Sequence, residues 1–150
     1  METRNAIDKF FASPPYAVVG VSRHKHKFGN TIFHEMKRRG LAVYPVHPHL
    51  AEIEGMTCFA SIADVPDEVQ SVVVVVHPED VRQIITACAR KGIENIWLQQ
   101  GAESDEAVEF ARHNKLNVVH GQCVLMFLDP VKSFHAAHRW VNKLIGAYPH

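Results

Sequence analysis

The sequence has no excess charge of either sign. Its 16 lysine and arginine residues are balanced by 16 aspartate and glutamate residues, so the formal net charge at pH 7 is zero. No overall electric field therefore draws nucleic acid or an anionic membrane to the chain, and we expect neither as a partner. A site for an anion has to be built from a local group of side chains.

Cysteines and long apolar runs are also scarce. The three cysteines, Cys58, Cys88 and Cys123, are odd in number and widely spaced, which favours a reducing compartment over a disulfide framework. The longest strongly apolar run, residues 72–76, is far too short to span a bilayer. The N-terminal stretch METRNAIDKFFASPP is charged and has no apolar core, unlike a signal peptide. A cytoplasmic protein is the expectation.

The sequence does contain enough apolar residues for one folded domain over residues 1–150, since 47% of them are hydrophobic. Runs typical of buried strands alternate with stretches of helical periodicity. This alternation predicts an α/β fold, with a doubly wound, Rossmann-like, five-stranded parallel sheet covered by helices on both faces. We expect strand order 3-2-1-4-5. The strands are predicted at 16–22, 41–46, 71–76, 95–99 and 117–120, and the helices between them at 29–39, 78–91 and 103–113.

A last helix is predicted over residues 130–145, after the N-cap and N1 pair Asp129-Pro130. Its apolar stripe includes Phe134 and Val141 and is wider than a lone surface helix needs. We expect this helix to pack on the sheet, to dock on a partner, or to form a homodimer interface.

The turn after the first predicted strand, residues 20–30, carries the densest cationic patch at a predicted ligand edge. Arg23, Lys25 and Lys27 are three cations within five residues. The next helix begins at Gly29, and the N–H groups and positive dipole at a helix start favour phosphate. Because ligands of doubly wound sheets bind at the carboxyl ends of the strands, this turn predicts a site for a ligand with several phosphates. The alternative is a solvated surface loop.

This turn is not a regular dinucleotide-binding fingerprint. The second glycine of G-x-G-x-x-G is replaced by Ser22, and no acid stands at the end of the second strand to bind a ribose hydroxyl. The nearest acid, Glu52, comes after the strand end. NAD is therefore disfavoured, and NADP less so.

Other catalytic and metal motifs are missing from the sequence. There is no P-loop, nucleophile elbow or Ser-His-Asp arrangement. His47, His77 and His120 each end a different strand without a short ligand pair to anchor a metal, so we predict no metal site. Cys123 could be a reactive thiol, but a small buried residue is the favoured interpretation.

Taken together, several segments resemble the small bacterial and archaeal CoA-binding proteins. The resemblance covers about residues 15–128 in order and rests on VGVSR, KFGN, GLAVYPVHP, IEGMTCFASIADVP, VVVVVHPEDV, KGIENIWLQQGAESDEA and VVHGQCVLMF. The fold of these proteins is similar to the CoA-binding domain of the succinyl-CoA synthetase α subunit and of the NDP-forming acyl-CoA synthetases.

This resemblance implies a domain that holds coenzyme A or an acyl-CoA by its nucleotide end. In that family the turn after the first strand contacts the phosphates, and the ends of the second and third strands border adenosine and pantetheine. Together with the cationic turn, it predicts as binding residues Gly20, Val21, Ser22, Arg23, Lys25, Lys27, Phe28, Gly29, Asn30, His47, Pro48, His77, Pro78 and Gln100.

The resemblance does not imply an enzyme activity. The synthetases transfer acyl and phosphoryl groups with a phosphorylated histidine and a nucleotide-binding module in further domains, and neither has a counterpart in this sequence. We therefore expect binding without catalysis. The alternatives are an NADP- or other nucleotide-dependent enzyme and a regulatory interaction module.

Overall fold

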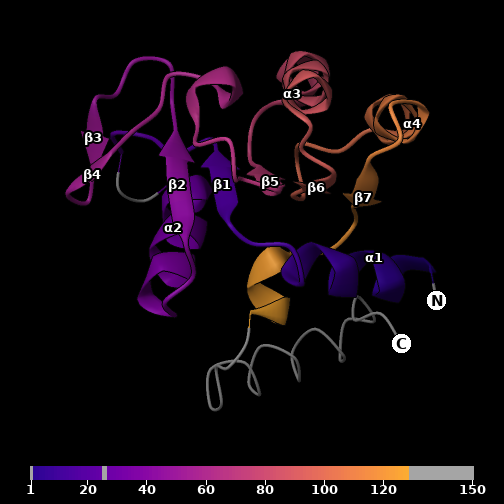
Figure 1. Ribbon diagram of the computed structural model, residues 1–150, viewed down its shortest axis with the longest axis horizontal. Coiled ribbons are helices and arrows are strands. Elements are labelled where there is room, and N and C mark those ends of the chain that lie inside the picture. Colours follow the sequence, from indigo (N-terminus) through magenta and orange to yellow (C-terminus); the bar gives the residue numbers. More distant parts are fainter. Residues whose placement is uncertain (1, 25–26, 129–150) are drawn as a thin grey trace.

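The computed structural model describes residues 2–24 and 27–128, in which strands and helices alternate (Figure 1). Lys25 and the predicted helix 130–145 lie outside these residues. In chain order the elements are α1 (Glu2–Phe11), β1 (Tyr16–Val19), α2 (Phe28–Arg38), β2 (Val43–Val46), β3 (Glu52–Ile53), β4 (Met56–Thr57), η1 (Ile62–Asp64), β5 (Ser71–Val74), α3 (Pro78–Lys91), β6 (Asn95–Leu98), α4 (Asp105–His113), β7 (Asn117–Val119) and η2 (Val124–Phe127).

The α/β prediction is confirmed, because five strands form one parallel sheet with helices on both faces. Figure 1 shows α3 and α4 on one side of this sheet and α1 on the other. The apolar core is accordingly divided into two layers. One layer contains residues of α3 and α4, and the other contains residues of α1, α2 and η2.

The predicted strand order is wrong. The sheet runs β2-β1-β5-β6-β7, which is 2-1-3-4-5 when its five strands are counted along the chain. Pro45 explains why β2 lies at the edge. The Phe59 N–H donates to the Pro45 carbonyl at 2.9 Å, on the side of β2 away from β1. The nitrogen of Pro45, which has no hydrogen to donate, faces this same outer side, and proline is found almost entirely on edge strands.

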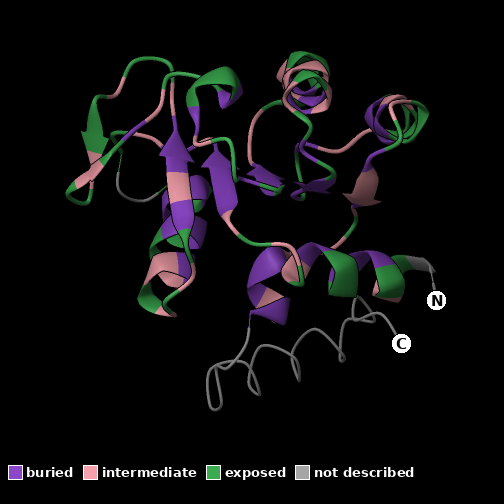
Figure 2. Cartoon of the chain, viewed as in Figure 1, coloured by how far each residue is buried: buried purple, intermediate pink, exposed green. Residues whose placement is uncertain are grey.

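The three inner strands, β1, β5 and β6, form the buried centre of the sheet. Every residue of β1, β5 and β6 is buried, as expected for strands covered on both faces (Figure 2). Trp97 of β6 is fully buried, and its ring lies 5.3 Å from that of Phe10 in α1. Its indole N–H donates to the Gln122 carbonyl at 2.9 Å, so the segment after β7 is joined to the sheet.

Sequence patterns missed the hairpin formed by β3 and β4. Each strand has only two residues, too few for a period of two to be visible. The turn between them is Glu54-Gly55, and both residues have positive φ values, 48° and 77°. Such a pair is typical of a two-residue hairpin turn. The hairpin matters because it stands beside the turn that follows β1.

Within residues 2–24 and 27–128, no helix combines the length and the apolar character that a bilayer crossing requires.

Candidate functional site

Two glycines let the turn after β1 pack closely against the start of α2. Gly20 has φ 121°, and a Cβ on it would lie 2.0 Å from the carbonyl oxygen of Val75, just after β5. A Cβ on Gly29 would lie 2.2 Å from the carbonyl oxygen of Gly20. Both obstacles are backbone atoms that cannot move aside, so the sequence needs glycine at both positions. The start of α2 is thereby held against the carboxyl end of β1.

Asn30 holds the turn in shape. Its Oδ1 accepts a hydrogen bond from the Ser22 N–H at 2.6 Å, and its Nδ2 donates to the Ser22 carbonyl at 2.6 Å. Asn30, which the sequence predicted as a binding residue, is only 8% exposed. The Ser22 hydroxyl in turn accepts from the His24 N–H at 3.1 Å. These bonds position the backbone that leads to Arg23.

Replacing Asn30 with alanine should destabilise the protein by about 1–3 kcal/mol, because two part-buried backbone groups of Ser22 lose their partner. The free energy of unfolding, measured by urea denaturation, tests this. The control is Thr31→Ala, a change at the exposed neighbouring position, which should alter stability by less than about 0.5 kcal/mol. Equal stabilities of the two variants would contradict a role for Asn30 in holding the turn.

The turn presents positive charge that has no ion-pair partner in the described part of the chain. Arg23 and Lys27 are exposed, and neither forms an ion pair among residues 2–24 and 27–128. The first turn of α2 carries no acidic residue either, so its positive dipole end has no nearby carboxylate on that helix. This combination favours an anionic ligand.

A hollow of about 760 Å³ opens beside the turn. The β3–β4 hairpin forms its other wall and is fastened to α2 through Glu54. The Glu54 carboxylate lies 2.8 Å from His34 Nδ1. The backbone carbonyl of Glu54 accepts a hydrogen bond from Lys37 Nζ at 2.7 Å. The lining residues are Ser22, Arg23, Asn30, Thr31, His34, Leu50, Glu52, Ile53 and Glu54.

The hairpin changes one conclusion drawn from the sequence. β2 ends at Val46 without an acid, as predicted, but the chain returns and places Glu52 in the lining of the same hollow as Arg23. A carboxylate is therefore present near the turn, although it does not belong to the strand end. Sequence reasoning missed the hairpin residues of this wall, and Glu54-Gly55 was the one signal that could have revealed them.

His47, at the end of β2, is a neutral hydrogen-bonding group. Its Nδ1 accepts from the His49 N–H at 2.9 Å, so the ring proton is on Nε2. Partial burial lowers the pKa of His47 below its usual value near 6.5, and the charges of His49 and Arg23 lower it further. At pH 7 this ring can donate a hydrogen bond through Nε2, and its neighbour Pro48 is exposed.

The corrected strand order brings the end of β5 next to the turn. Because β5 pairs directly with β1, the exposed His77 and Pro78 follow the strand adjacent to Gly20, whereas order 3-2-1-4-5 would have separated them. In a sheet of order 2-1-3-4-5 the ligand crevice lies between the first and third strands, where the chain reverses direction across the sheet. In this sheet the corresponding place is at the carboxyl ends of the neighbouring strands β1 and β5.

The remaining predicted residues differ in their exposure. Val21 is only 1% exposed and packs in the core, so its side chain faces away from solvent. Phe28 is 44% exposed at the start of α2, and Gln100 is exposed after β6. Lys25 lies outside the described residues. Among the described residues no group of three or more His, Cys, Asp or Glu side chains is placed to hold a metal ion.

Residues 15–129 match the CoA binding domain family. The chain belongs to this family. Two curated relatives of this CoA-binding domain are ADP-forming acetate–CoA ligases. Subunit alpha of ligase II from Pyrococcus furiosus is 29% identical over 129 residues, or 79% of this chain and 28% of the relative. Ligase II from Archaeoglobus fulgidus is 33% identical over 101 residues, or 66% of this chain and 15% of the relative.

Solved structures agree with this assignment. A conserved hypothetical protein from Pyrococcus furiosus superposes with a TM-score of 0.73 at 33% identity, covering 75% of this chain and 97% of that one. The apo form of a dinucleotide-forming acetyl-coenzyme A synthetase from Ca. Korarchaeum cryptofilum gives 0.64 at 26% identity, covering 73% of this chain and 26% of that one. The CoA-binding domain thus corresponds to about a quarter or less of the ligases and synthetase it matches, but to nearly all of the small protein.

Proposed function

We propose that this CoA-binding domain binds coenzyme A or an acyl-CoA through the turn after β1, and that it does no chemistry of its own. The observation that carries the proposal is the rigid turn itself. Gly20, Gly29 and Asn30 hold it against the sheet, and it presents Arg23 and Lys27, which form no ion pair among the described residues. A fixed backbone together with unpaired cations is well suited to binding a diphosphate group.

The path of the ligand follows from the neighbours of the turn. The diphosphate would lie at the start of α2, and the adenosine with its 3′-phosphate would lie toward Arg23 and the hollow beside it. His47 would donate a hydrogen bond through Nε2 at this end. The pantetheine arm would cross the end of β5 at His77-Pro78 and continue toward Gln100 after β6.

Binding without catalysis is consistent with the state of two of the three thiols, Cys58 and Cys88, which are buried. Burial raises the pKa of the Cys88 thiol to about 12 and also raises that of Cys58, which makes both thiols poor nucleophiles at neutral pH. The proposal predicts that the protein forms no acetyl-CoA from acetate, ATP and CoA. Turnover above that of a boiled sample would refute this part.

The sharpest test of the ligand compares CoA, dephospho-CoA and NAD. We expect CoA to bind most tightly, dephospho-CoA about ten- to a hundred-fold more weakly, and NAD more weakly still. The reason is that a charge-assisted contact to the 3′-phosphate is worth about 1.5–3 kcal/mol. Thermal-shift titrations with the three ligands at matched ionic strength measure the order. Stabilisation by NAD equal to that by CoA would overturn the proposal.

Glu52 supplies the rival interpretation, since its carboxylate in the hollow could bind ribose hydroxyls of a dinucleotide. The variant Glu52→Gln distinguishes the two. If the site is for CoA, removing this negative charge near a bound phosphate leaves CoA affinity unchanged or raises it. If the site is for a dinucleotide, the same change weakens NAD binding. Glu68→Gln, an exposed acid outside the hollow, is the matched control.

A further inference from the structure

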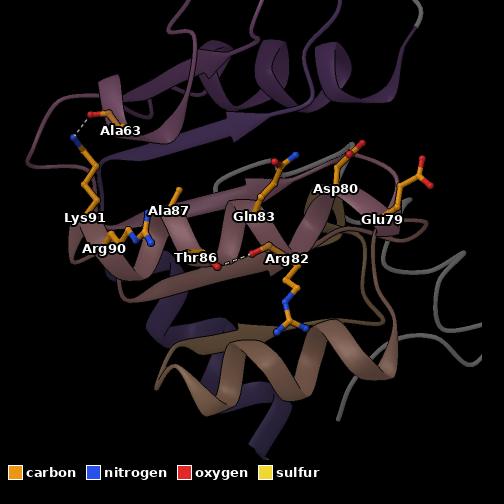
Figure 3. Close-up of a pocket in the computed structure, with 9 residues that line it drawn as sticks. All are labelled: Ala63, Glu79, Asp80, Arg82, Gln83, Thr86, Ala87, Arg90 and Lys91. Carbon is orange, nitrogen blue, oxygen red and sulfur yellow. Dashed lines mark hydrogen bonds between the residues drawn. The ribbon is translucent and has the colours of Figure 1, made fainter.

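The outer face of α3 carries a second hollow, of about 840 Å³, on the side of the helix that faces η1 (Figure 3). It takes no part in the proposed CoA site. Its floor is the exposed side of α3, and Ala63 of η1 forms one rim. The lining residues are Ala63, Glu79, Asp80, Arg82, Gln83, Thr86, Ala87, Arg90 and Lys91.

Two of the cations on this face already have partners. The Arg82 guanidinium lies 4.1 Å from the ring centroid of Phe110 and 3.6 Å from Glu106, both in α4, and Figure 3 shows it turned toward that helix. Lys91 Nζ donates to the Ala63 carbonyl at 2.9 Å and to Asp67 at 3.2 Å. Both cations are therefore already engaged within this chain.

The ends of the face carry opposite charges that find no ion-pair partner within the part of the chain that the structure describes. Glu79 and Asp80 stand in the first turn of α3, and Arg90 in the last. Between them the face is uncharged at Gln83, Thr86 and Ala87, of which Ala87 has a small side chain that permits a close approach of another helix.

This pattern is complementary to itself when reversed. If two α3 helices lie antiparallel across a two-fold axis, Asp80 faces Arg90 of the second copy, and Gln83 faces Ala87 of the second copy. Each pair then occurs twice, as an isologous interface requires, and the two helix dipoles are also antiparallel. We propose that the occupant of this hollow is α3 of a second copy of the chain, forming a homodimer.

The interface should be weak and sensitive to salt, because its charged pairs lie at the rim of a helix–helix contact and are screened by ions. In sedimentation velocity over a protein concentration series, the mass should rise from 16.9 kDa toward twice that value at low salt. High salt should shift the rise to higher protein concentration.

Charge-reversal variants test the pairing itself. Asp80→Lys alone and Arg90→Glu alone each place two like-charged pairs across the interface, so each should remain monomeric. Mixing the two variants, or combining both changes in one chain, restores opposite charges in both pairs and should restore the dimer. A folding defect cannot be repaired by mixing, so the mixture separates repulsion from misfolding. Circular dichroism melting checks each variant.

The controls make the same charge changes on the exposed side of the neighbouring helix α4. Glu109→Lys and Arg112→Glu should each dimerise as the wild type does, because both residues lie outside the hollow. A wild-type protein that stays at 16.9 kDa up to its solubility limit would overturn the proposal. So would a dimer that persists in both single variants, or a mixture that remains monomeric.

Discussion

Replacing Arg23, Lys25 and Lys27 together with alanine is expected to weaken CoA binding by about tenfold or more. Each charge-assisted contact to a phosphate is worth about 1.5–3 kcal/mol, so the loss of even one full contact reaches this size. Arg23 and Lys27 are exposed and lack carboxylate partners in the described structure, so their removal breaks no ion pair there. The fold should remain, and the affinity should fall.

Isothermal calorimetry at two salt concentrations measures this effect. The difference between wild type and variant should shrink at high salt, because ions screen the contacts that the variant lacks. The matched control replaces three exposed cations away from the turn, Lys9, Arg38 and Arg112, with alanine and so changes the net charge equally. A control that loses as much affinity as the turn variant, or a turn variant with unchanged affinity, would remove the turn from the site.

Gly29→Ala is expected to have a large effect for a single added methyl group. In most helices this substitution is stabilising by about 1 kcal/mol, because alanine is the better helix former. Here the new Cβ would lie 2.2 Å from the Gly20 carbonyl oxygen and 2.7 Å from its carbon, so α2 has to move away from the turn. We expect a net loss of stability of about 1–3 kcal/mol, as for other overpacked sites, together with a loss of CoA affinity.

Urea denaturation and calorimetry on this variant test both parts. Gly92→Ala is the matched control, since Gly92 has a positive φ of 82° but no atom within 4 Å of an added Cβ. That control should lose about 1–2 kcal/mol from the left-handed backbone alone and bind CoA normally. If Gly29→Ala were more stable than wild type and bound CoA normally, the close contact between turn and helix would not be needed for the site.

The alternation of elements could be predicted because each element carries its own local signal. After Ser71 the run SVVVVV is apolar, as expected for a strand covered on both faces, and β5 is fully buried. In α3, Pro78 is at the first helical position and Gly92 ends the helix in the left-handed conformation, which are the usual places of these two residues. These features depend on residues only a few positions apart, so the sequence alone was sufficient.

Of the strand order, only the edge position of β2 could be predicted from the sequence. Pro45 within VYPV marks an edge strand, and placing that strand at the edge excludes order 3-2-1-4-5. Apolar periodicity shows that a segment is a strand and which of its faces are covered. It contains no information on which strands are neighbours, because every inner strand of a parallel sheet has the same apolar pattern.

The sequence by itself determined the α/β class, the alternation of elements and the placing of three cations in the turn after the first strand. Only the tertiary structure decided what that turn is built against. The bonds from Asn30 to Ser22, the contact of Gly29 with the Gly20 carbonyl and the wall that Glu52 shares with Arg23 join residues eight or more positions apart. Such contacts depend on how the chain returns to the same sheet edge, and periodicity along the sequence cannot reveal them, because it records only which face of an element is buried.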